Sequence, residues 1–420
     1  MLELPRLHRR MVGWLRQRLP DAALGAVADP RCARRVTWPM RRLLTTIVTA
    51  MATGRRGLRQ VESLTKEASL DALRALDLRR ALPDTTQRDL LVKLDPHELR
   101  AALHRQVLRA HRRHALDADG LPSGVVSMDG KATTIDAWDS PYVQRQGSHG
   151  VIRTVTATLV SSRVRVCLDA YPIPAKTNEM GIFKDALDAL VDTYGGTALL
   201  QVVMYDAGAC SQANARHTRK RKLHYVMVLN EGQKTLYAEA RRVLGALDES
   251  RGHKVEMTDE HRTVHYTLWL TNELAGWLDW DHLVTVVRIR REVLGPDGRP
   301  TQTGERYFVS SLGSQAFVPI RWARLLRARW GVENNCHHTF DQEFAEDART
   351  WIKRSAPGAL NVVLLRRIAY NLVALFRGRT LRGEDGVPPA WGDLMRWAYN
   401  ALIAATASTV AGLRAPRPAT

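Results

Sequence analysis

The part of the chain that most restricts its fold lies between residues 123 and 230, where short β-branched runs alternate with amphipathic segments. Three β-rich runs come first, and a helical pattern that stops at Gly195-Gly196 follows them. A strand, a basic helix and a further strand complete the block. In order, the segments are GVVSMDGKATTI, HGVIRTVTATLVSSRV, VRVCLDAYPIP, NEMGIFKDALDALVDTYGG, ALLQVVMYD, ANARHTRKRK and HYVMVLN. This alternation predicts an α/β fold in which helices pack against a mixed sheet.

Different patterns flank this block. Residues 1–122 place apolar residues at helical intervals, so we expect a helical N-terminal DNA-binding domain, with a merely solvated arginine-rich face as the alternative. Residues 232–311 are β-rich and are interpreted as an insertion into a domain that spans 123–376. Residues 377–420 are expected to form a helical C-terminal segment and a disordered tail.

The charge balance of the chain restricts its partners. The sequence has 62 Lys and Arg against 43 Asp and Glu, a formal net charge of +19. Such an excess favours a polyanionic partner, because each phosphate that a cation neutralises releases condensed counterions. A basic protein without such a partner is the alternative that charge alone leaves open.

The cysteines and the apolar stretches restrict the compartment. The four cysteines are scattered without a C-x-x-C pair, which argues against a disulfide framework or a zinc knuckle and fits a reducing cytosol. The first twenty residues lack an apolar core of signal-peptide length. The apolar stretch NVVLLRRIAYNLVALF is interrupted by Arg366 and Arg367, so no membrane span is expected. We therefore expect a cytoplasmic protein with no membrane partner.

Three acidic residues on different elements indicate a metal site. Asp129 and Asp206 each come at the end of an apolar, β-branched run, and Glu333 lies in a segment, Arg327–Arg349, that we expect to be helical. Carboxylates at the centre of a sheet are costly to bury without a partner, and they are the ligands that hard divalent ions prefer. Two such ions held by carboxylates can catalyse phosphodiester cleavage. On so basic a protein, the sequence predicts this chemistry on DNA.

Each acid also has an ordinary structural explanation. Asp129 precedes Gly130 and could belong to a turn. Asp206 could cap the helix that follows it, and Glu333 could pair with Arg329 four residues earlier. The metal site becomes the better account only when the three residues are taken together, in this order and on these elements.

Several short motifs carry a resemblance to a known family. The set comprises SMDGK around Asp129, AKTNE at 175–179, YDAG at 205–208, YVMVLNEGQ at 225–233, RYFVSSL at 306–312 and the block RARWGVENN…HHTFDQEFAEDAR. In this order, the motifs resemble those of DDE insertion-sequence transposases. The branch is that of the H-repeat-associated proteins in the insertion-sequence-four superfamily. The resemblance runs from about residue 83 to residue 377.

The resemblance implies a fold, a site and a reaction. The fold would be a ribonuclease-H-like core with Asp129 on its first strand, Asp206 on its fourth, and a β-rich insertion before Glu333. These three acids would be the catalytic and metal-binding residues, holding two Mg²⁺ or Mn²⁺ ions. DNA transposition, a form of DNA recombination, would then take two steps at the element ends. Hydrolysis would first free a 3′-hydroxyl, and that hydroxyl would then attack the target DNA.

The signature around the glutamate is only partly present. The superfamily places a tyrosine, an arginine, the glutamate and a lysine at fixed intervals. Here Arg329 and Glu333 match, whereas Leu326 and Phe340 occupy the tyrosine and lysine positions. These departures put in doubt the contacts that the signature makes with the DNA ends.

Four residues beside the acids are candidate DNA-binding residues: Lys131, Arg329, Trp330 and Asn334. A lysine or arginine would bind phosphate, an amide would bond a phosphate oxygen or a metal-bound water, and an indole would stack on a flipped base. Trp269, Trp277 and Trp280 are further stacking candidates, although a tryptophan is more often a core residue. The basic run from Arg216 to Lys222 could contact the DNA backbone or form a solvated helix face.

The sequence therefore favours a metal-dependent DDE transposase that binds double-stranded DNA, both its terminal inverted repeats and its target. Pairing two ends would require at least a dimer. The alternative is a catalytically inactive or domesticated DNA-binding relative. A nuclease without strand transfer would share the acids and the fold, and a glycosidase with paired carboxylates is disfavoured by the charge.

Overall fold

The computed structural model describes residues 4–78, 81–121, 123–138, 140–259, 262–295, 297–380 and 388–411. Its centre is one ten-stranded mixed sheet in the order β2-β3-β1-β5-β6-β10-β9-β8-β7, with β4 paired to β3. The strands are β1 Val125–Ile135, β2 Val143–Gln146, β3 His149–Leu159, β4 Cys167–Pro172, β5 Val202–Tyr205, β6 His224–Leu229, β7 His253–Asp259, β8 Arg262–Thr271, β9 Thr285–Leu294 and β10 Pro300–Ser310.

Five of these strands form the ribonuclease-H-like core that the sequence predicts. β1, β3 and β4 are antiparallel neighbours, whereas β5 pairs in parallel with β1 and β6 in parallel with β5. Helix α7 (Phe183–Tyr194) connects β4 to β5, and α8 (Gln212–Lys220) connects β5 to β6. Parallel neighbours need such crossover helices, which explains the alternation of patterns in the sequence. The predicted fold class is confirmed.

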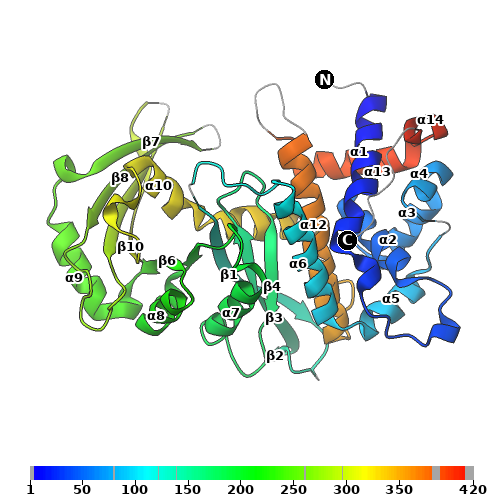
Figure 1. Cartoon of the computed structure of the whole chain (residues 1–420), viewed down its shortest axis with the longest axis horizontal. Helices are drawn as coiled ribbons and strands as arrows, with labels where there is room; N and C mark the ends of the chain where they lie inside the picture. Colours follow the sequence, from blue (N-terminus) through cyan, green and yellow to red (C-terminus); the bar gives the residue numbers. More distant parts are fainter. Residues whose placement is uncertain are drawn as a thin grey trace.

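The insertion extends the same sheet. β10 pairs antiparallel with β6, and β9, β8 and β7 follow it outward (Figure 1). The insertion opens with a helix, α9 (Lys234–Gly245), where the sequence pattern was interpreted as β-rich throughout. That helix buries Leu236, Ala240 and Leu244, which recur every four residues, so its period is helical and the interpretation was wrong there.

Helices from both ends of the chain gather beyond the opposite edge of the sheet (Figure 1). The predicted helical character of residues 1–122 is confirmed by the N-terminal helices, and the C-terminal helices pack among them. They are α1 Leu4–Arg18, α2 Met40–Ala52, α3 Leu58–Glu67, α4 Leu70–Ala75, α5 Asp84–Lys93, α6 Pro96–Arg112, α12 Ala356–Thr380, α13 Trp391–Ala404 and α14 Ala407–Val410. The expected boundary after residue 376 falls inside α12, and the tail RAPRPAT lies outside the described residues.

Helix α12 lies between the group of terminal helices and the sheet. It packs against α2, α5 and α6 on one side and against β4 on the other. Over the described residues, its segment Ala356–Gly378 has the length and the mean hydropathy, 1.5, of a membrane span, yet its whole apolar window is buried inside the protein. The two arginines that interrupt this segment are buried as well, and both contact Glu346.

Candidate active site

Asp129 lies in the middle of β1 rather than at its end. Its partner across the antiparallel ladder is Thr156 of β3, and β1 continues for six more residues with β3. The ladder between β1 and β5 is shorter and stops at the pair Ser127–Met204. The expectation that Asp129 ends its strand is therefore wrong, because β1 continues to Ile135 alongside β3. Asp129 does lie just beyond the end of the shorter ladder between β1 and β5. The turn explanation for Asp129-Gly130 is excluded, because both residues are extended.

Asp206 follows β5 directly, as expected. Since β1 and β5 run in parallel and Ser127 pairs with Met204, Asp129 and Asp206 each lie two residues beyond that last pair. Their side chains thus leave the sheet at the same edge. Asp206 also caps a short 3₁₀ helix, Ala207–Ala209, since its Oδ1 accepts a hydrogen bond of 2.9 Å from the Gly208 amide. The capping explanation is correct and does not compete with a role at this edge.

Glu333 reaches the same region from a distorted helix. The predicted continuous helix is in fact α10 (Pro319–Ala328), a π-helical segment (Val332–His337) and α11 (His338–Gln342). π-Helical turns are rare and are frequently found at functional sites. The segment packs against β1, and the Ser127 hydroxyl donates a 2.7 Å hydrogen bond to the carbonyl oxygen of Arg329. The Arg329 guanidinium lies 3.6 Å from the Glu333 carboxylate, the expected ion pair.

The acidic side chains at this edge of the sheet affect the pKa of Asp129. Burial, together with the negative charges of Glu333, Asp206 and Glu179, raises the pKa of Asp129 to about 7. The His337 ring lies 3.5 Å from the Asp129 carboxylate, but its own pKa is lowered to about 3 by burial and by the positive charges of Arg367 and Lys131. A neutral imidazole cannot balance the carboxylate. The edge therefore holds an excess of negative charge inside a basic protein.

Divalent ions fit this charge and this set of donors. Carboxylate oxygens are the ligands that Mg²⁺ and Mn²⁺ prefer, and a cation would relieve the repulsion that raises the pKa of Asp129. As the side chains lie, no three His, Cys, Asp or Glu residues in the described ranges are close enough together to hold an ion. Ligation therefore requires side-chain rotation. The Glu333 side chain, 43% exposed, has the room for it.

The raised pKa leads to a first prediction. In metal-free protein, Asp129→Asn should stabilise the fold at pH 8 by about 1–2 kcal/mol and have little effect at pH 4. The sign follows from the proton balance: between the unfolded pKa and about 7, the unfolded chain loses the Asp129 proton while the folded chain keeps it, so wild-type stability falls as the pH rises. Thermal unfolding in EDTA at both pH values measures the difference. A larger stabilisation at pH 4 would contradict the coupling.

The residue that sequence reasoning missed is Glu179. It lies between β4 and α7, and its carboxylate rests against Gly130, the neighbour of Asp129. The block AKTNE was recognised as part of the family resemblance but gave this residue no role. A signal was present in the sequence, because a glycine next to a strand-borne acid marks a place where another group approaches the backbone closely.

The four candidate DNA-binding residues have different surroundings. The Lys131 ammonium is buried and pairs with Asp341 at 2.7 Å and Asp347 at 3.2 Å, so it can bind phosphate only if these pairs open. Arg329 is 8% exposed, and its Nε is buried without a hydrogen-bond partner. Trp330 and Asn334 line a cavity of about 700 Å³. Their roles in DNA binding stay predictions.

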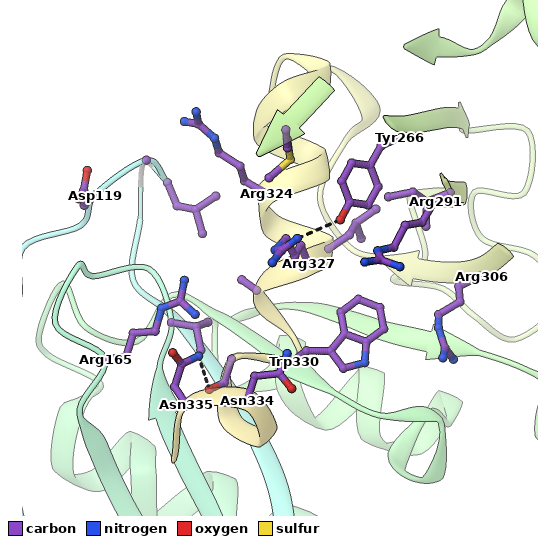
Figure 2. A pocket seen from close by; sticks show the side chains of 18 of the residues that line it. Asp119, Arg165, Tyr266, Arg291, Arg306, Arg324, Arg327, Trp330, Asn334 and Asn335 are labelled. Atoms are coloured by element: carbon purple, nitrogen blue, oxygen red, sulfur yellow. Dashed lines mark hydrogen bonds between the residues drawn. The ribbon is translucent and has the colours of Figure 1, made fainter. Parts of the chain in front are cut away.

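The cavity beside Trp330 is strongly basic. It lies between the π-helical segment, α10 and the strands of the insertion (Figure 2). Five arginines line it against a single carboxylate, Asp119; they are Arg165, Arg291, Arg306, Arg324 and Arg327. The Arg306 guanidinium lies over the indole of Trp330 at 5.4 Å, and Arg327 donates a hydrogen bond to the Tyr266 hydroxyl. Positive charge and two aromatic rings in one cavity suit a nucleic-acid strand.

Several of the other stacking and backbone candidates are engaged within the protein. Trp269 is 1% exposed and donates a hydrogen bond to the carbonyl of Asp248, which makes it a core residue. In the basic run, Arg216 pairs with Asp281 and Arg221 pairs with Asp188. All four cysteines are free, and three of them are buried, so none forms a disulfide.

Comparison with protein families decides the family. Residues 122–372, more than half of the chain, match the family described as the transposase DDE domain. The chain belongs to this transposase family. Residues 22–107 of the transposase match a second family, described as DDE_Tnp_1-associated. Both matches agree with the insertion-sequence-four resemblance, and transposases with this domain use divalent metal ions.

No curated protein matches the transposase. Among solved structures, it is similar to a piggyBac transposase synaptic complex with hairpin DNA determined by cryo-EM. The identity is 13% and the TM-score is 0.44, over 97% of this chain and 80% of the other.

Proposed function

We propose that this transposase binds the ends of an insertion sequence and catalyses metal-dependent cleavage and transfer of DNA strands. The observation that carries the proposal is the edge of the sheet where Asp129 and Asp206 emerge in register and Glu333 approaches from the π-helical segment. The electrostatic effect of Glu333 and Asp206 on Asp129 supports one shared site.

In this proposal, Asp129, Asp206 and Glu333 hold two Mg²⁺ or Mn²⁺ ions. The ions would supply Lewis-acid stabilisation of the attacking and leaving oxygens. Arg329 holds Glu333 in place through their ion pair, and Ser127 fixes the backbone of Arg329 to β1. These contacts keep the helix-borne acid aligned with the two strand-borne acids.

The same site serves two displacements at phosphorus. In the first, a water oxygen bonds to phosphorus and the bond to the 3′-oxygen breaks, which leaves a 3′-hydroxyl and a 5′-phosphate. In the second, that 3′-hydroxyl attacks a phosphodiester of the target, and the target's own 3′-oxygen leaves. Atoms balance in both steps, and neither needs an oxidant or a nucleotide cofactor.

The basic cavity supplies the DNA contacts in this proposal. It shares Trp330 and Asn334 with the segment that carries Glu333, so a strand bound there would lie beside the acids. We propose that the transposase acts as at least a dimer, since two DNA ends must be joined together, and that it acts in the cytoplasm.

A second prediction tests the cavity. Arg291→Ala and Arg306→Ala should each weaken binding to end DNA about three- to tenfold near 0.1 M salt. Each should also reduce the slope of the logarithm of the binding constant against the logarithm of the salt concentration by about one. The reason is that each removes a cation from a cavity with a single carboxylate. Fluorescence anisotropy across a salt series measures both values. Arg242→Ala is the matched control, because Arg242 is exposed and paired with Glu239. Equal losses in all three variants would argue against DNA in the cavity.

The proposed function itself is tested by incubating the protein with DNA that flanks its reading frame, a target plasmid and Mg²⁺. Nicked ends and joined products are expected. Binding without cleavage would favour the inactive relative, for which one observation speaks: Leu326 and Phe340, at the tyrosine and lysine positions of the signature, are fully buried. Cleavage without joining would indicate a nuclease.

A further inference from the structure

A fourth carboxylate stands beside the three acids of the proposed site. Glu179 lies after β4 and before α7, and its carboxylate lies against the backbone of Gly130. A Cβ atom added to Gly130 would lie 1.9 Å from the carboxyl carbon of Glu179 and 2.0 and 2.2 Å from its oxygens. The carboxylate thus occupies the space that any side chain at position 130 would need, next to Asp129.

This carboxylate lacks a protein partner. Within the described ranges, no hydrogen bond or ion pair reaches its oxygens, although the residue is half-buried. Burial raises the pKa of Glu179. The positive charge of Arg153 lowers it, without forming an ion pair, and the charge of Asp206 raises it again. A partly buried carboxylate in this position costs free energy unless a cation or a donor satisfies it.

A second unpartnered group, the Tyr205 hydroxyl, lies close enough to these acids to be affected by their charges. Tyr205, the last residue of β5, is 1% exposed, and its hydroxyl is buried without a hydrogen-bond partner. Its ring packs edge-on against Phe183 of α7 at 5.2 Å. Burial raises the pKa of Tyr205, and the charges of Glu179, Asp206 and Asp129 raise it further, in that order. Tyr205 directly precedes Asp206, so an unpaired hydroxyl and an unpaired carboxylate both lie near the acids of the proposed site.

We propose that Glu179 is a fourth carboxylate of the metal-binding site and binds a divalent ion together with Asp129 and Asp206. This inference rests on the proposed function, since it assumes that the acids hold a cation. Gly130 is then required because only a residue without a side chain lets Glu179 approach Asp129. The Tyr205 hydroxyl can donate to a Glu179 oxygen that the ion does not use, which would hold the carboxylate in its ligating orientation.

Metal binding by the full-length protein, without DNA and without turnover, tests the inference. Titration with Mn²⁺, followed by the electron paramagnetic resonance signal of the free ion, gives the affinity of each variant. Glu179→Gln should weaken Mn²⁺ binding about 10- to 100-fold. Gly130→Ala should do the same, because the new methyl group must displace the carboxylate. Asp129→Asn serves as the positive control, and Glu256→Gln, at an exposed acid of β7, should keep the wild-type affinity.

The outcomes separate this inference from the proposed function. If Glu179→Gln binds Mn²⁺ as tightly as the wild type while Asp129→Asn does not, Glu179 is no ligand and the transposase proposal stands. If the wild type neither binds Mn²⁺ nor cleaves end DNA, both the role of Glu179 and the proposed transposase function are wrong. Thermal unfolding in EDTA guards against a merely structural effect: a ligand variant should unfold at or above the wild-type temperature, and a marked decrease would overturn the inference.

Discussion

Asp129→Asn, Asp206→Asn and Glu333→Gln should each reduce strand cleavage on the order of 10³-fold or more, while affinity for end DNA changes less than about twofold. Each substitution keeps the shape of the side chain and removes one negative charge from the edge where the three acids meet. Without that charge the site would hold a divalent cation too weakly to stabilise both reacting oxygens, as the proposed function requires. In the proposed function, DNA binding depends on the arginines of the basic cavity instead, so the affinity should be unaffected.

Single-turnover cleavage of labelled end DNA in Mg²⁺, with binding measured in parallel in Ca²⁺, checks this expectation. Asp192→Asn is the matched control, since Asp192 is an exposed residue of α7, and it should cleave at the wild-type rate. Near-normal cleavage by one of the three variants would remove that acid from the site. A parallel loss of DNA binding would show that the substitution disturbed the DNA-contacting surface rather than the chemistry.

The central fold was predictable because its information is local. Each crossover helix between parallel strands has its own hydrophobic period, and the change of period is visible in the residues themselves. The register that places Asp129 beside Asp206 was not visible. It depends on where the β1–β5 ladder stops, at Ser127 and Met204, and that point is set by pairing between distant segments.

The parts of the site that escaped prediction are long-range contacts. The sequence makes Lys131 a candidate for phosphate binding, but it pairs with Asp341 on α11 and with Asp347 beyond that helix. Glu179 could not be predicted as a fourth acid, because its position depends on the contact between the loop before α7 and Gly130 of β1. Helix α9 was missed for a different reason: its three core residues recur every four residues, but Tyr237 and Val243 between them are β-formers, which favoured a strand.

The segment that carries Glu333 is fixed to the fold by a buried ion cluster. Glu346, just beyond α11, is fully buried, and its backbone amide bonds to the carbonyl of Phe340. Its carboxylate pairs with Arg367 and lies 3.8 Å from the guanidinium of Arg366, both on α12. The Arg367 guanidinium also lies over the ring of Phe340 at 3.9 Å. Loss of this acid would leave two buried cations without their counter-charge.

Glu346→Gln should therefore destabilise the protein by about 3–5 kcal/mol, because removing one partner of a buried ion pair leaves the other charge uncompensated. At about 2–4 °C per kcal/mol, the melting temperature should fall by roughly 10 °C. Glu256→Gln, at an exposed residue of β7, should leave the melting temperature unchanged. Glu346→Gln combined with Arg367→Met should recover much of the loss, since both charges are then removed. A double variant no more stable than the single one would argue against a stranded charge.

The pH dependence gives this prediction a second, independent check. Burial alone would raise the pKa of Glu346, but Arg367 and Arg366 outweigh it and hold the pKa below its ordinary value. The contribution of a carboxylate with a lowered pKa is fully present above its unfolded pKa, about 4.3, and is lost as the pH falls through the folded value. The gap in melting temperature between wild type and Glu346→Gln should thus be constant from pH 5 to 7 and narrow below about pH 4. A gap that stays constant down to pH 3 would mean that packing, rather than charge, accounts for the destabilisation.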